Sequence, residues 1–188
     1  MKLAFTSTRS TVGIKAQLIS VEVHLSNGLP SFGIVGLPET AVKESKDRVR
    51  SATLNSQFEF PCCKITVNLA PADIPKIGSG FDLPIAVGIL VASGQIPNLK
   101  LDSHEFIGEL ALNRNLRGVA AIIPVVLAVH RDKHQLIIAA ANANEAALAD
   151  KDHIFIAENL REVCGYLCGN NELQQPPPSL RDPLKFFN

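Results

Sequence analysis

The alternation of apolar and polar positions changes in character along the chain. Apolar residues alternate with polar ones over residues 19–25 and again over residues 65–69, the period of two that predicts strands with one buried and one wet face. Further along, the segments QLIIAA and HIFIA are continuously apolar, which is typical of strands covered on both faces. Together they predict an α+β domain whose second half is wound like a βαβ unit.

Helical signals lie between these strands. A helix is expected from Pro38, which suits a first turn, to about residue 55, with an apolar stripe at Val42, Val49 and Ala52. A second helix is expected from Asp82, as its N-cap, to Gly94, and its apolar content all round predicts that it is buried.

The remaining elements follow from shorter patterns. A brief strand is expected at residues 32–35. Phe106, Leu110 and Leu112 predict one face of a strand, followed by a turn at residues 113–115 and a returning strand. Helices are expected over residues 124–133, from about residue 144, and over residues 159–168.

Length and composition predict one domain with a tail. The chain has 188 residues and 46% hydrophobic content, enough to bury one core. After residue 169 the sequence becomes NNELQQPPPSLRDPLKFFN, a polar and proline-rich run typical of a linker. We therefore expect a domain at residues 1–169 and, at residues 170–188, a linker that leads to a further module.

Charge and cysteine content exclude several function classes. Eighteen basic and eighteen acidic residues cancel, so binding of nucleic acid or of an acidic membrane would need a local patch. The apolar run at residues 83–92 is too short to span a bilayer, and the N-terminus has no apolar signal region, so we expect a cytoplasmic chain without a membrane partner. The four cysteines, one adjacent pair and one pair four residues apart, and the five histidines show no ligand spacing, and no metal site is expected.

Two local groups of cations are candidate nucleic-acid contacts. One forms a stripe on the first expected helix, and the other flanks the turn near residue 114. No aromatic residues are interleaved with them, so base stacking is not expected. A solvated helix face is the alternative interpretation. The candidate contacts are Lys43, Lys46, Arg48, Arg50, Arg114 and Arg117.

The loop KIGSGFD, residues 76–82, carries glycines, a lysine and a serine that could in principle serve phosphate binding or nucleophilic chemistry. It lacks the Gly-Lys pair of a phosphate-binding P-loop. Lys76 and Ser79 form a candidate base and nucleophile, but nothing in the sequence indicates the burial that would lower the pKa of Lys76. A structural turn is the preferred interpretation, with Gly78 and Gly80 allowing close backbone approach and Asp82 capping the helix.

Three long segments also carry a family resemblance: STRSTVGIKAQLISVEVHLSNGLPSFGIVGLPETAVKESKDRVRSA, KITVNLAPADIPKIGSGFDLPIAVGIL and GELALNRNLRGVAAI. From residue 3 to residue 169 the chain resembles the N-terminal domain of magnesium-chelatase-like AAA+ proteins, the YifB and ComM group. That domain is similar to the proteolytic domain of Lon, so the resemblance implies a ribosomal-protein-like βαβ fold with a mixed sheet packed with helices.

The resemblance also implies what this chain lacks. The positions of the Lon serine and lysine fall on Gly80 and Ile123, which have neither a hydroxyl nor a titratable group. The expected role is therefore a non-catalytic assembly and DNA-guiding domain with no cofactor of its own. ATP and magnesium would serve a missing AAA+ module, in a possible homo-hexamer that acts in DNA branch migration and competence.

Two other functions stay open from sequence. One is a serine-lysine peptidase that uses Ser79 and Lys76. The other is a protein-binding adaptor that presents clients to the motor.

Overall fold

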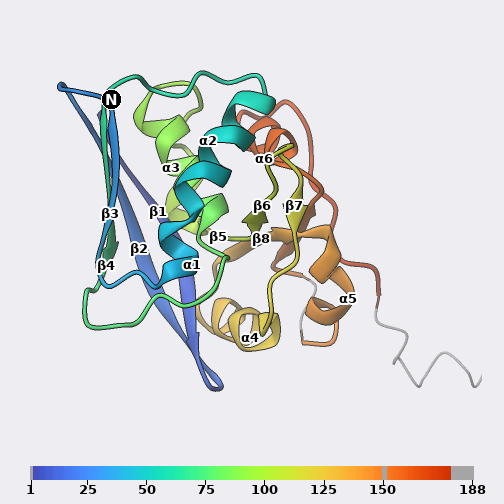
Figure 1. Ribbon diagram of the computed structural model, residues 1–188. Coiled ribbons are helices and arrows are strands. Elements are labelled where there is room, and N and C mark those ends of the chain that lie inside the picture. Colours follow the sequence, from blue (N-terminus) through green and yellow to red (C-terminus); the bar gives the residue numbers. More distant parts are fainter. Residues whose placement is uncertain (1, 150–151, 179–188) are drawn as a thin grey trace, which may run out of the picture.

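A seven-stranded mixed sheet organises the molecule in a computed structural model, which describes residues 2–149 and 152–178. The strand order is β3-β4-β2-β1-β5-β8-β9, and a separate hairpin is formed by β6 and β7 (Figure 1). The strands are β1 (Leu3–Val12), β2 (Lys15–Ser26), β3 (Ser31–Val35), β4 (Lys64–Ala70), β5 (His104–Ile107), β6 (Glu109–Leu110), β7 (Leu116–Arg117), β8 (Gln135–Ala139) and β9 (Ile154–Ala157). The predicted α+β class is confirmed.

Helices cover the two halves of this sheet differently. The α-helices are α1 (Thr40–Lys43), α2 (Ser45–Asn55), α3 (Asp82–Ala92), α4 (Ile122–Asp132), α5 (Ala143–Ala146) and α6 (Leu160–Leu167), with short 3-10 turns at Leu101–Ser103 and Ala140–Asn142. In Figure 1, α1, α2 and α3 lie on one side of β1 to β4. No described helix is long and apolar enough to cross a membrane.

The burial pattern of the strands shows one fully covered face in the first half of the sheet and two covered faces in the second. Ile19, Val21 and Val23 of β2 are fully buried, whereas the residues between them are partly exposed. In β8, Ile137 belongs to the core beneath α3, while Leu136 and Ile138 belong to a second core with α4. β5, β8 and β9 run parallel, so the second half is wound as the sequence predicted.

β1 was not predicted from sequence. Its core-facing positions are Ala4, Thr6, Thr8 and Ser10, which are small or polar and so produce no apolar alternation. Thr6 Oγ1 donates a hydrogen bond of 2.9 Å to the carbonyl of Pro84 in α3, which satisfies its buried hydroxyl.

Two further local predictions were right only in part. The expected helix over residues 38–55 is split into α1 and α2, and at the break Ser45 Oγ donates to the Val42 carbonyl at 2.6 Å in place of a continuous helical ladder. The expected strand through Phe106 and Leu112 leaves the large sheet at Gly108, whose N–H donates to Gly80 O. Leu112 is consequently 57% exposed, although the hairpin turn is where it was predicted.

The first residues of the expected linker pack against the domain. Ile156 N donates to Gln174 O at 2.8 Å, and Leu173 and Pro176 are buried. The segment therefore meets β9 at Gln174, while residues 179–188 of the expected linker fall outside the described residues. The boundary at residue 169 stays a prediction.

Candidate nucleic-acid interface

The loop between β4 and α3 leaves no room for a nucleophile at Gly80. A Cβ at this buried position would lie 2.8 Å from Ile107 Cγ1 and 3.6 Å from Val119 Cγ1. The backbone is fixed there as well, since Gly80 O accepts from Gly108 N at 3.0 Å. Ile123, the other position that the resemblance assigned to the dyad, is partly buried in the first turn of α4.

Lys76 is buried, contrary to the expectation from sequence. Its Nζ donates to the carbonyl of Pro71, and burial lowers the pKa of this ammonium group although Asp73 opposes the shift. Among the described hydrogen bonds, none joins Lys76 to Ser79, which lies beside Gly80 in the loop. The two residues of the peptidase alternative are present, but the lysine is committed to a backbone carbonyl.

Asp82 starts α3 without capping it, so its predicted role was wrong. The N-cap position is Phe81, and no side chain caps the helix. The buried carboxylate instead accepts from Arg48 Nε at 2.6 Å and from Leu110 N at 3.0 Å. Burial raises the pKa of Asp82 to about 6, although both hydrogen bonds oppose the shift. Asp82 thus joins α3 to α2 and to the hairpin.

The predicted nucleic-acid cations therefore divide into two groups. Arg48 is bound to Asp82, and Arg117 Nη1 lies 3.3 Å from Glu109 Oε1. Arg50 and Arg114 contact no carboxylate in the described part of the chain: Arg50 lies over the ring of Phe60 at 5.1 Å, and Arg114 Nη1 donates to Asn55 O at 3.3 Å. Lys43 is exposed and Lys46 is partly buried, and neither lysine forms a salt bridge with a described carboxylate.

Aromatic residues do lie beside these cations, which corrects the expectation that stacking groups are missing. Phe60 follows α2 in sequence and turns back onto it, with its ring 6.0 Å from that of Phe32 in β3. The two rings line a cavity of about 350 Å³ together with Lys46 and Arg50. Sequence spacing could not show this contact, because Phe32 comes from a strand that precedes the helix.

A further arginine was missed by sequence reasoning. Arg161 in α6 lies beside Arg114 and Phe58 around a cavity of about 590 Å³. Its Nη1 donates to Gln57 Oε1 at 2.7 Å, so it also contacts no described carboxylate. No pattern in the sequence joins residue 161 to the hairpin, because α6 reaches it only through the fold.

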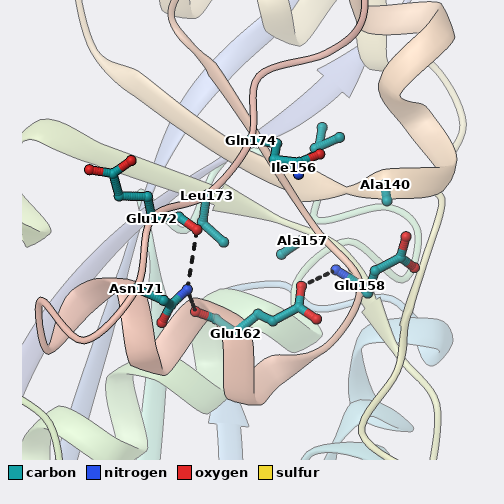
Figure 2. Close-up of a pocket in the computed structure, with 9 residues that line it drawn as sticks. All are labelled: Ala140, Ile156, Ala157, Glu158, Glu162, Asn171, Glu172, Leu173 and Gln174. Atoms are coloured by element: carbon teal, nitrogen blue, oxygen red, sulfur yellow. Dashed lines mark hydrogen bonds between the residues drawn. The ribbon is translucent and has the colours of Figure 1, made fainter.

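A neighbouring cavity is acidic and unsuited to a polyanion. Glu158, Glu162 and Glu172 line a cavity of about 390 Å³ together with residues 171 and 173–174 (Figure 2). Asn171 Nδ2 donates to the backbone carbonyls of Glu162 and Glu172, which holds the segment in place. Within the described residues there is no group of three or more metal-ligating side chains.

A different set of charges is buried between β1, β5 and α4. Arg9 is 3% exposed and donates to both oxygens of Glu105, at 2.7 and 2.6 Å. The same guanidinium lies 2.7 Å from Asp132 Oδ2, and His134 Nδ1 lies 2.8 Å from Glu105 Oε1. This cluster ties the two halves of the sheet together and presents no free cation to a ligand.

Comparison with known proteins places these features in context. The sequence profile of the family described as subunit ChlI of Mg-chelatase matches residues 21–142. The competence protein ComM of Haemophilus influenzae is 52% identical over 92% of this chain and 34% of its own length. The uncharacterized protein YifB of Salmonella typhimurium is 50% identical over 94% of this chain and 35% of its own, and that of Escherichia coli is 47% identical over 95% and 35%. The chain thus spans about a third of the length of the curated relatives it matches.

Proposed function

The chain belongs to the Mg-chelatase ChlI family, and from this premise we propose that it is a non-catalytic assembly and DNA-guiding domain of a larger ComM-like AAA+ ATPase. The relative from Haemophilus influenzae is named for competence, which supports a role in handling incoming DNA. ATP and magnesium would bind in the motor, in the two thirds of the relatives that this chain does not span. The complete protein would work in the cytoplasm as a homo-hexamer engaged in branch migration.

One observation carries the DNA-guiding part of the proposal. Arg50, Arg114 and Arg161, the carboxylate-free arginines, form no ion pair with a described carboxylate, although Asp47 and Glu162 line their cavities. The helix that carries Arg50 adjoins the hairpin that carries Arg114, since Asn55 Nδ2 donates to Leu112 O at 2.7 Å. Guanidinium groups form strong, often bidentate hydrogen bonds with phosphate oxygens, so a nucleic-acid backbone is a suitable ligand for these arginines.

The non-catalytic part is supported by the loop at Gly80. A hydroxyl-bearing side chain there would collide with Ile107, so a Lon-like nucleophile has no place at that position. Lys76, the expected base for Ser79, donates to the carbonyl of Pro71 and forms no described hydrogen bond with Ser79. A fluorophosphonate serine probe should therefore label wild type no more than Ser79→Ala. Labelling that depends on Ser79 would establish the peptidase instead.

DNA binding can be tested by fluorescence anisotropy with branched and single-stranded oligonucleotides. The protein should be titrated up to ~10⁻⁴ M, the range of non-specific binding. Lys46→Glu combined with Arg50→Glu should weaken binding by about tenfold or more, since two phosphate contacts become repulsive. Lys15→Glu combined with Lys133→Glu is the matched control, because both lysines are exposed and neither lines the cavity beside Phe60. Equal losses in both double variants would contradict the assignment, and binding only to a protein client would favour the adaptor.

A further inference from the structure

The groove that contains Arg114 and Arg161 is built from three separate segments. Phe58 follows α2, Arg114 lies in the hairpin turn, and the rest belongs to α6 and the chain after it. We call it the arginine groove, and the residues that matter for it are Phe58, Arg114, Asn159, Arg161, Asn170 and Asn171.

Backbone hydrogen bonds hold the walls of the arginine groove together. Leu160 N at the start of α6 donates to Arg114 O at 3.0 Å, and Leu116 N donates to Glu158 O at 2.8 Å. On the other side, Phe58 N donates to Thr53 O at 3.2 Å, which fixes the aromatic residue to the end of α2. The groove is therefore formed before any ligand arrives, which reduces the ordering cost of binding.

The electrostatics of the groove favour an anion. Arg114 and Arg161 donate only to a carbonyl and an amide oxygen. The carboxylate that lines the groove, Glu162, is occupied on both oxygens: Oε2 accepts from Glu158 N and Oε1 from Asn159 Nδ2, each at 2.8 Å. Two cations thus face a ligand against one carboxylate that is already satisfied by the N-terminus of its own helix.

We propose that the arginine groove binds the sugar-phosphate backbone of a single nucleic-acid strand, with Arg114 and Arg161 on phosphates and a base against Phe58. Phe58 packs against the core, is partly exposed and lines the groove, and amide side chains supply further donors. The groove places one aromatic ring beside its two arginines, an arrangement that suits an unstacked base and its flanking phosphates. The acidic cavity of Figure 2 shares Glu162 and Asn171 with the groove and limits the path of a strand on that side. The proposal rests on the proposed DNA function and adds a second, strand-selective contact to it.

The alkylation rates of two exposed cysteines can report on binding at this site. Cys168 lines the arginine groove, whereas Cys62 lines the separate cavity beside Phe60. A saturating oligo-dT should slow iodoacetamide alkylation of Cys168 by about threefold or more, read by mass spectrometry, whereas Cys62, beside Lys46 and Arg50, reports on the other proposed DNA contact. Protection of Cys62 alone, or of neither thiol while anisotropy shows binding, would overturn the groove. Equal protection of Cys168 by inorganic phosphate at the same phosphate concentration would overturn the claim of a strand.

Variants separate this proposal from the broader function. Arg114→Gln with Arg161→Gln should lower affinity for single-stranded oligo-dT by about tenfold and affinity for duplex DNA much less. The matched control is Arg117→Gln with Arg131→Gln, because those arginines are exposed but bound to carboxylates. If the groove variant keeps wild-type affinity while Lys46→Glu with Arg50→Glu loses it, the groove is wrong and the DNA function stands. If wild type binds no DNA at low salt, both fail.

Discussion

Two regions of the molecule use arginine in opposite ways. Between β1, β5 and α4, Arg9 is buried and shared by two carboxylates. Around the arginine groove, Arg114 and Arg161 stay at the surface and contact neutral oxygens. Because buried charges need partners and surface charges do not, the same residue type fastens the sheet in one region and remains available to a ligand in the other. Stability and binding should therefore respond to different arginines.

The largest effect is expected at Arg9. Arg9→Met leaves Glu105 fully buried with only His134 beside it, which should lower the free energy of unfolding by about 3–5 kcal/mol. Urea denaturation of wild type and variant measures this difference in the free energy of unfolding. Arg131→Met, whose guanidinium also contacts Asp132 but is 73% exposed, should change stability by less than about 0.5 kcal/mol. Comparable losses in both variants would remove the distinction between the two regions.

The next effect depends on pH and concerns Asp82. Its pKa is raised to about 6 in the folded state, so the fold takes up a proton that the unfolded chain has already released. The stabilising contribution of this titration is complete below about pH 4 and is lost as the pH rises through about 6. The stability of wild type relative to Asp82→Asn should thus fall by up to about 3 kcal/mol between pH 4 and pH 7. Denaturation curves of both proteins across this range would refute the assignment if their difference stayed constant.

Gly80 should give a smaller effect. Gly80→Ala places a methyl group against Ile107 and should cost about 1–3 kcal/mol through overpacking. Gly33→Ala is the control, since a Cβ there meets no atom within 4 Å. Thermal unfolding compares the two, and a Gly80→Ala protein as stable as wild type would mean that this position has room for a side chain after all.

The carboxylate-free arginines should contribute least to stability. Arg50→Gln, Arg114→Gln and Arg161→Gln should each change the free energy of unfolding by less than about 0.5 kcal/mol, because they satisfy no buried charge. The same samples used for urea denaturation serve for anisotropy. A loss of DNA affinity accompanied by an equal loss of stability would indicate a structural role for these residues.

Local pattern was sufficient for much of the fold. Local apolar patterns predicted the strands around Val21, Val67 and Ile137 and the buried helix at Leu83. These patterns were sufficient because the same apolar residues are buried in the folded protein. β1 could not be found this way, because its buried face consists of Ala, Thr and Ser. The hairpin was found, but its separation from the large sheet depends on a contact between Gly108 and Gly80 that no local pattern encodes.

The site was less predictable than the fold. The spacing of Lys46, Arg48 and Arg50 on one helix could not tell which cation would meet a carboxylate, because Asp82 belongs to another helix. Burial of Lys76 follows from the path of the loop around Pro71, and Arg161 joins Arg114 only through packing of α6 on the hairpin. The family resemblance, by contrast, was readable from long motifs and is confirmed by the profile match over residues 21–142.

The salt dependence of single-strand binding tests the central claim most directly. If Lys46, Arg50, Arg114 and Arg161 contact phosphates, a plot of log affinity against log salt concentration for oligo-dT should have a slope of about −3, and changing all four to Gln should bring the slope close to zero. Changing Arg48 and Arg117, which are bound to carboxylates, should leave the slope at its wild-type value. A slope that persists in the fourfold variant, or disappears in the Arg48 and Arg117 variant, would contradict the account.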